Sequence, residues 1–124
     1  MSLQAFLYVG LGGFLGANAR YILSLLITER VASATGLAIP FGTIFVNATG
    51  SFLLALFTAW ITQRSGIPDS VRLLIGTGFF GAYTTFSTYA NESINLFGSS
   101  NSLFGWGYII GTNLLCLLGV LLGL

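Results

Sequence analysis

The sequence has no lysine and no histidine, a single cysteine, and charged residues at only 6% of its 124 positions. A soluble domain usually carries about 25% charged residues, so this chain has too few charges to cover a surface that faces water. Hydrophobic residues make up 55% of the chain instead. These proportions predict an integral membrane protein.

The missing residue types also exclude several kinds of chemistry. With one cysteine, Cys116, and no histidine, the chain cannot form an internal disulfide or a metal site of the His/Cys type. We interpret Cys116 as a small apolar helix residue. Three acidic residues and no histidine leave few general bases, which argues against an enzyme. A net charge of +1 without clustered basic residues gives no sign of a nucleic-acid surface.

Four segments are long and apolar enough to span a bilayer, which needs about 20 residues per helix. The connections between them are polar or contain proline, and we predict Asp69 or Ser70 as the N-cap of the third helix. No segment resembles a soluble domain, so residues 1–124 form a single all-α transmembrane domain. The predicted helices run from about Leu3 to Ile27, Gly42 to Ile61, Val71 to Phe97 and Leu103 to Leu124, with a last link at 98–102.

The distribution of arginine does not fix the orientation of this domain. Four helices place both termini on one side of the membrane, together with Arg64 and Arg72 and opposite Arg30. Short-loop Lys/Arg bias sets topology, and a count of two against one allows insertion both ways. Four helices also enclose little interior. We therefore expect an antiparallel, dual-topology dimer.

Glycines in the first helix suggest close helix packing. Gly12 and Gly16 form a small-xxx-small pair, with Gly10 and Gly13 beside them. Such spacing lets the backbones of membrane helices approach closely. We interpret these residues as packing rather than chemistry, and we interpret the asparagines at 18, 91 and 113 in the same way.

The segment 76–92 combines glycines, hydroxyls and aromatic rings inside an apolar region. Gly76, Gly78 and Gly81 weaken a helix, since each costs about 1 kcal/mol relative to alanine. Irregular backbone inside a membrane survives only where it is buried in protein or lines a polar path. We predict a break in the third helix that frees carbonyls around Gly81 to Thr84. Such oxygens suit a hard cation, and the segment marks a crossing point for something small and polar.

Two charged residues stand near or within the apolar segments. Arg20 either extends toward the membrane surface or serves a function, by attracting an anion or fixing a dimer. Glu92 is either interfacial or a polar contact that tunes entry to a pathway.

Polar and aromatic side chains provide neutral groups for an anion. Asn47 and Ser51 share a helix face, and the Asn47 amide is either a donor to a partly dehydrated anion or a clasp between subunits. Phe86 and Tyr89 also share a face. Their ring edges carry partial positive charge, so they are either pore wall or plain packing, with the hydroxyls of Ser87 and Thr88 beside them.

Taken together, three segments resemble the small fluoride channels of the CrcB/Fluc family. They are residues 13–21, 42–51 and 78–92, and they occur in the family's order along the whole chain. The resemblance implies an antiparallel homodimer with two pores and a broken third helix. It also implies passive, selective export of fluoride, and thus fluoride resistance, across the bilayer of the cell's inner (plasma) membrane by a multi-pass channel.

The resemblance also assigns roles to individual residues. Asn47 would be the pore amide, and the pore wall would include two aromatic positions and adjacent hydroxyls. The backbone carbonyls of Gly81 and Thr84 from both subunits would hold a structural sodium ion at the dimer centre. The other implied positions are Phe86, Tyr89, Thr88 and Ser87 in the pore, Arg20 at the vestibule and Glu92 at the pore end.

Three residues depart from the family pattern. Tyr89 replaces a usual Phe, and its hydroxyl could donate to fluoride or obstruct the path; Ala90 and Cys116 each replace a usual Ser. These departures keep open a second hypothesis, a non-conducting or partner subunit of a heterodimeric fluoride channel. A small multidrug-type proton-coupled exporter is a third, but it requires an acid in the first helix, where this chain has Arg20.

Overall fold

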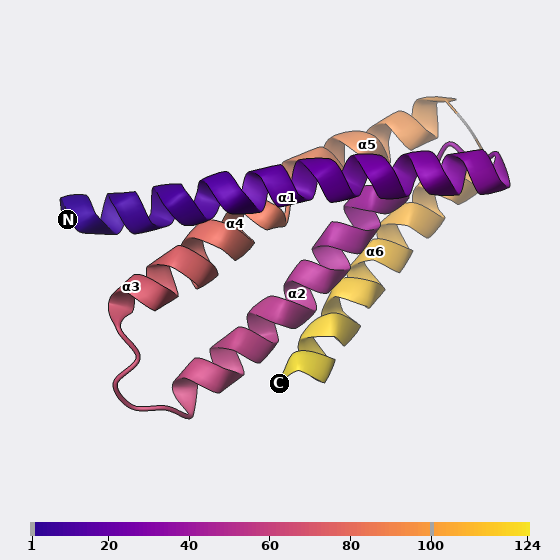
Figure 1. The fold of residues 1–124 in the computed structure, drawn as a ribbon. Coiled ribbons are helices and arrows are strands. Elements are labelled where there is room, and N and C mark those ends of the chain that lie inside the picture. Colours follow the sequence, from indigo (N-terminus) through magenta and orange to yellow (C-terminus); the bar gives the residue numbers. More distant parts are fainter. Residues whose placement is uncertain (1, 100) are drawn as a thin grey trace.

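Helices account for all the regular structure in the part of the chain that the computed structural model describes, residues 2–99 and 101–124. Ser100 of the predicted link 98–102 lies outside the described residues. The chain runs back and forth through four helical segments (Figure 1). Three helices, α1 (Leu3–Thr35), α2 (Phe41–Thr62) and α6 (Ser102–Gly123), are each long and apolar enough to cross a membrane. The prediction of an all-helical membrane domain is confirmed.

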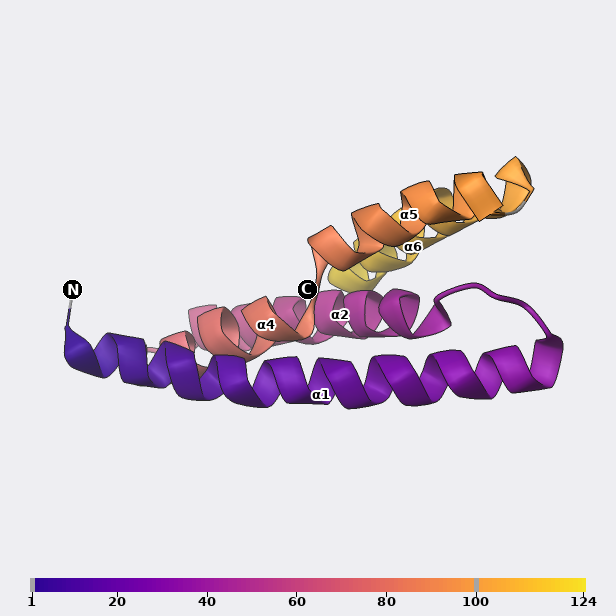
Figure 2. The ribbon, with the colours of Figure 1, turned by 90° about the horizontal axis from the view of Figure 1, so that it is seen from above.

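The third segment is broken, as the sequence predicts. It begins with α3 (Asp69–Val71), continues through η1 (Arg72–Phe80) and α4 (Gly81–Tyr83), and resumes after an interruption as α5 (Phe86–Ser99). Viewed from above, α4 and α5 are separated by a step (Figure 2). The interruption lies at the end of the predicted stretch: Gly81 is still helical, whereas Thr84 is extended with φ −83° and ψ 155°.

The glycine-containing stretch before the break is wound more widely than an α-helix. Residues 72–80, which include Gly76 and Gly78, form a π-helix. Long π-helices are rare, and π-helical turns inside α-helices occur frequently at functional sites. The helix-weakening effect expected of these glycines therefore takes the form of widened turns. The break itself comes at Thr84, four residues after the π-helix ends at Phe80.

Two predicted boundaries are wrong. α1 continues for eight residues beyond the predicted end at Ile27 because residues 28–35 contain neither glycine nor proline. It ends where Gly36 adopts φ 71° and donates its N–H to the Ala32 carbonyl at 2.8 Å. At the third segment, Pro68 takes the N-cap position without a side-chain cap. Asp69 instead lies in the first turn, where its carboxylate favours the helix N-terminus.

Backbone-to-backbone contact at glycine joins α1 to the third segment. Gly12 and Gly16 are the buried residues of α1. A Cβ on Gly12 would overlap the Leu74 carbonyl, and a Cβ on Gly16 would overlap the Phe79 carbonyl. A Cβ on Gly78, from the opposite side, would lie 2.8 Å from the Val9 oxygen. The packing interpretation of the small-xxx-small pair is confirmed.

α2 lies at the centre of the molecule and contacts both α1 and α6 (Figure 2). Gly42 approaches the Ser24 backbone of α1, while Cβ atoms on Gly119 and Gly123 of α6 would lie 2.9 and 2.5 Å from carbonyl oxygens of α2. Val46 of α2 is fully buried and packs with Tyr83 at the end of α4. The central helix is thus held by close backbone contacts on two sides.

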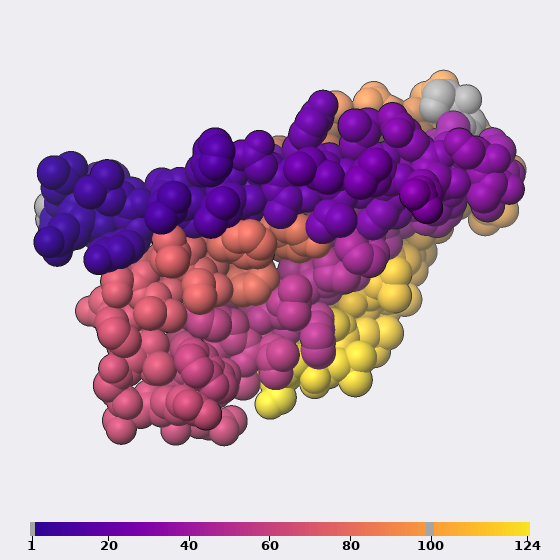
Figure 3. Space-filling view, viewed as in Figure 1, coloured from indigo at the N-terminus to yellow at the C-terminus, as the bar shows by residue number. Residues whose placement is uncertain are grey.

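The outer surface is apolar. α1 forms a ridge along the visible face of the molecule (Figure 3). Its outward side chains include Leu7 and Phe14, which are 64% and 66% exposed, and Leu122 of α6 is 79% exposed. In water such a surface would be costly, whereas a bilayer or a second protein surface accommodates it.

Gly12→Ala should lower the free energy of unfolding in detergent by about 2 kcal/mol, because the added methyl overlaps the Leu74 carbonyl. Gly10→Ala is the matched control, since no atom lies within 4 Å of a Cβ at that position. It should be neutral or stabilise α1 by up to about 1 kcal/mol. Equal destabilisation by both substitutions would contradict the packing argument.

Candidate functional site

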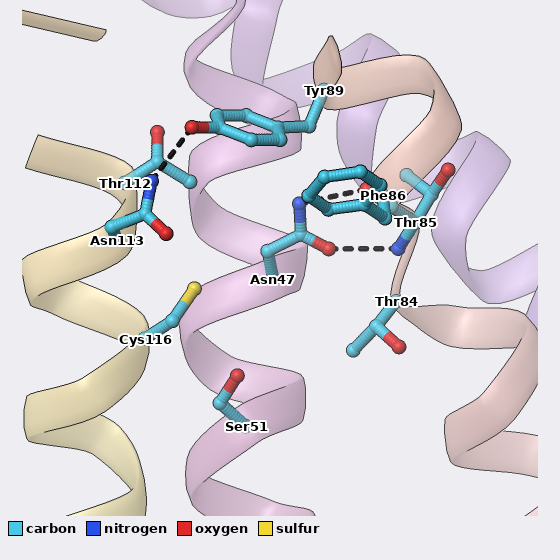
Figure 4. Close-up of a pocket in the computed structure, with 9 residues that line it drawn as sticks. All are labelled: Asn47, Ser51, Thr84, Thr85, Phe86, Tyr89, Thr112, Asn113 and Cys116. Carbon is cyan, nitrogen blue, oxygen red and sulfur yellow. Dashed lines mark hydrogen bonds between the residues drawn. The ribbon is translucent and has the colours of Figure 1, made fainter. Parts of the chain in front are cut away.

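The break in the third segment is held by a single buried amide. Asn47 Nδ2 donates to the Thr85 carbonyl at 3.1 Å, and the Thr85 N–H donates to Asn47 Oδ1 at 2.8 Å (Figure 4). Both residues are buried. Buried backbone groups need hydrogen-bond partners, and here one side chain provides both for Thr85. The clasp considered from sequence therefore exists, but it joins two segments of one chain.

This pairing removes the Thr85 N–H from the helical hydrogen-bond pattern. In a continuous α-helix the Thr85 N–H would bond to the carbonyl of Gly81. It is given to Asn47 instead. On the other side of the break, Thr85 Oγ1 accepts from the Thr88 N–H at 3.3 Å and so caps the start of α5. The same residue thus ends one helix and begins the next.

A cavity of 230 Å³ opens beside the clasp, between α2, the break and α6 (Figure 4). None of its lining residues has a charged side chain, and most of them have a hydroxyl or amide group. The Thr112 hydroxyl is buried there without a partner among the described residues. The lining residues are Asn47, Ser51, Thr84, Thr85, Phe86, Tyr89, Thr112, Asn113 and Cys116.

The two aromatic residues predicted from sequence lie together at this cavity. Their ring centroids are 5.6 Å apart and the rings are tilted by 54°. Phe86 is 78% exposed, whereas Tyr89 is 8% exposed and also packs against Tyr108. The Tyr89 hydroxyl accepts a hydrogen bond of 2.7 Å from Asn113 Nδ2. α5 therefore presents one ring outward and one ring against α6.

A second cavity, of 370 Å³, lies on the other side of the break. Thr85 borders both cavities, so the clasped residue lies between them. The predicted vestibule and pore-end residues, Arg20 and Glu92, both line the second cavity, together with Thr88. Ser87 is exposed and lines neither of these two cavities.

Glu92 is held by hydroxyls rather than lying loose at an interface. Thr43 Oγ1 donates to its Oε1 at 3.0 Å, and the Tyr108 hydroxyl donates to its Oε2 at 2.7 Å. These partners come from α2 and α6, so the carboxylate connects three helices. Charge-assisted hydrogen bonds of this kind are about twice as strong as neutral ones.

Several residues of the site escaped the sequence analysis. Asn113 was assigned to helix packing, yet it lines the first cavity and bonds to Tyr89. The sequence did contain one pattern that could have indicated that α6 contributes to the site. Three of its residues follow each other at intervals of four and so share one helix face. They are Tyr108, Thr112 and Cys116. Thr85 carried no such signal, because its importance comes from a partner on another helix.

The chain is similar to a family of known proteins along nearly its whole length. Residues 7–124 match the family described as "CrcB-like protein, Camphor Resistance (CrcB)". Relatives called "Fluoride-specific ion channel FluC" occur in Koribacter versatilis, 46% identical over 98% of this chain and 93% of the relative, and in Hydrogenobaculum sp., 40% identical over 95% and 93%. A protein called "Fluoride-specific ion channel FluC 2" in Moorella thermoacetica is 43% identical over 94% and 93%.

Asn47→Leu should lower the free energy of unfolding in detergent by about 3 kcal/mol, because it leaves the peptide groups of Thr85 buried without partners. Asn18→Leu is the matched control. Asn18 is exposed and bonds only to the Phe14 carbonyl of its own helix, so its replacement should change stability by less than about 1 kcal/mol. A stable Asn47→Leu protein would show that the clasp does not hold the break.

Proposed function

The chain belongs to the CrcB-like family, and on that premise we propose that it is a fluoride-selective channel that exports fluoride passively across the plasma membrane. It is a multi-pass membrane protein and not an enzyme, as its relatives' identity as ion channels and its apolar helices indicate. The small multidrug-type exporter is set aside by this membership. The observation that carries the proposal is a pair of cavities with hydroxyl-bearing side chains in their linings, on either side of Thr85, the residue that the buried Asn47 amide holds.

The chemistry of the first cavity suits a small anion that sheds water. Anion pathways exchange the hydration shell for protein groups, and this lining offers amide and hydroxyl donors together with ring edges. Neutral donors attract an anion without binding it as tightly as a full cation would. Asn47, Phe86 and Tyr89 would form the narrow part of the path.

The second cavity would be the approach to that path. Arg20 would attract anions to its own part of the lining, although Glu92 adds a negative charge to the same cavity. Thr88 supplies a hydroxyl on the way, and Ser87 lies beside it on the same helix turn. Glu92, fixed by its two hydroxyl partners, would stand at the end of the pore.

A second copy in antiparallel orientation would complete the walls. Phe86 is 78% exposed although it lines the first cavity. An exposed ring in that position needs a facing surface, and the apolar ridge of α1 offers area for contact. The near balance of arginines between the two sides permits both orientations.

The proposed structural sodium ion would bind at the end of α4. Carbonyl oxygens are the ligands that hard cations prefer, and the Gly81 carbonyl lacks its usual helical donor because Thr85 bonds to Asn47. One chain would offer the Gly81 and Thr84 carbonyls, and a second copy would offer two more. When bound, the cation would balance the negative ends of the two helices.

A heterodimer is the second candidate, because two of the three departures from the family pattern lie in the site. Tyr89 and Cys116 both line the first cavity, whereas Ala90 does not. In that case an unlike homologous subunit would take the place of the second copy.

Liposomes that contain only this chain should release fluoride, and Phe86→Leu should abolish the release, because the ring wall of the pathway is lost. Phe6→Leu, which removes an exposed ring from α1 away from both cavities, is the control and should leave efflux unchanged. A fluoride electrode measures the rate. No efflux from folded dimers would reject the homodimeric channel, and rescue by a second subunit would support the heterodimer.

Replacement of sodium by N-methylglucamine during purification and assay should weaken the dimer and slow efflux, because the larger cation does not fit between backbone carbonyls. Light scattering and the fluoride electrode report the two effects. Restoring sodium should recover both. Dimers that remain equally stable and active without sodium would reject the cation site.

A further inference from the structure

Asn113 is fixed in one orientation by its own helix. Its Nδ2 lies 2.8 Å from the Ile109 carbonyl and 2.7 Å from the Tyr89 hydroxyl. An amide nitrogen has two protons, and these contacts use both. The reverse assignment would place Oδ1 against the Ile109 carbonyl, two acceptors in contact. The carbonyl therefore determines that nitrogen, not oxygen, faces Tyr89.

Because nitrogen faces Tyr89, Asn113 cannot accept a hydrogen bond from the Tyr89 hydroxyl. The phenol oxygen accepts a hydrogen bond from Asn113, so its own single proton remains free to form a hydrogen bond as donor. None of the described residues accepts it, although Tyr89 is 8% exposed. Thr112 beside it is 3% exposed, and its hydroxyl also lacks a partner among the described residues. In Figure 4 the Tyr89 hydroxyl points toward α6 beside Thr112.

A tyrosine hydroxyl with an unused proton beside an open cavity favours an acceptor that enters the cavity. A buried polar group without a hydrogen bond costs free energy, and an acceptor that enters the cavity recovers it. Tyr89 and Thr112 both line the 230 Å³ cavity, together with Asn47. Fluoride accepts hydrogen bonds and donates none, so it matches this set of donors.

We propose that Tyr89 donates its phenolic proton in a hydrogen bond to fluoride inside this cavity, and that Asn113 is a positioning residue that aims the hydroxyl. The proposal rests on the channel function proposed above and goes beyond it. The tyrosine is then neither a plain aromatic wall nor an obstruction. The bond to Asn113 holds its hydroxyl at the α6 side of the cavity, where an ion can pass it and contact it.

Fluoride efflux from liposomes tests the donor. Tyr89→Phe keeps the ring and removes the hydroxyl, so efflux should fall about tenfold, the effect expected when a charge-assisted hydrogen bond is lost. Tyr8→Phe removes a hydroxyl from α1 outside both cavities and should have no effect. Unchanged or faster efflux in Tyr89→Phe overturns the proposal, and a faster rate identifies the hydroxyl as an obstruction.

A double substitution tests the positioning role. Asn113→Leu should slow efflux, and it should slow it no further when Tyr89 is already Phe, because the amide acts through the phenol. Asn18→Leu is the matched control on α1. Additive effects of the two cavity substitutions would show that Asn113 does not act through Tyr89.

Infrared difference spectra test the donor independently of transport. The phenol C–O stretch of isotope-labelled tyrosine distinguishes a hydroxyl that only accepts from one that also donates. Sodium fluoride, with sodium chloride as reference, should shift one tyrosine band in the detergent-solubilised dimer. The shift should be absent from Tyr89→Phe. A shift without efflux would reject the channel and retain the donor; no shift from a protein that conducts would reject the donor.

Discussion

The Asn47 amide on α2 meets both peptide groups of Thr85, and the architecture of the site depends on this pair of hydrogen bonds. Inside a membrane an interrupted helix has no water to bond its free N–H and C=O groups. A side chain that offers a donor and an acceptor together replaces what the next helical turn would have provided. Because the pair holds the break in place, Phe86 and Tyr89 lie in a new helix beside the first cavity, and Thr85 lies between the two cavities.

The rest of the molecule provides a rigid frame for this interruption. Lipid removes the hydrophobic drive for helix association, so packing between membrane helices depends on close van der Waals contact and on hydrogen bonds. Here glycines of α1 and α6 bring backbones together, and Glu92 connects α2, α5 and α6 through two hydroxyls. The helices on either side of the break are thereby fixed independently, so the break is localised to two residues.

The sequence predicted the features that depend on local pattern. Helix-length apolar runs gave the four segments, the spacing of Gly12 and Gly16 gave the α1 contact, and the three-residue interval placed Phe86 and Tyr89 on one side. Features that depend on long-range partners were missed. Thr85 is 38 residues from Asn47 and Asn113 is 24 residues from Tyr89, and no periodicity relates them. The end of α1 was misplaced because polar residues outside the bilayer core remain compatible with a helix.

That extended α1 has a further consequence for how the protein sits in its bilayer. At about 1.5 Å per residue, its 33 residues measure about 50 Å, against a hydrocarbon thickness of about 30 Å. A tilt of up to about 40° does not absorb this mismatch. The last two turns, with Glu29 and Arg30, would therefore extend beyond the hydrocarbon core into the headgroup region. A change in the thickness or curvature of the bilayer would then act on α1, whose glycines contact the segment that carries the break.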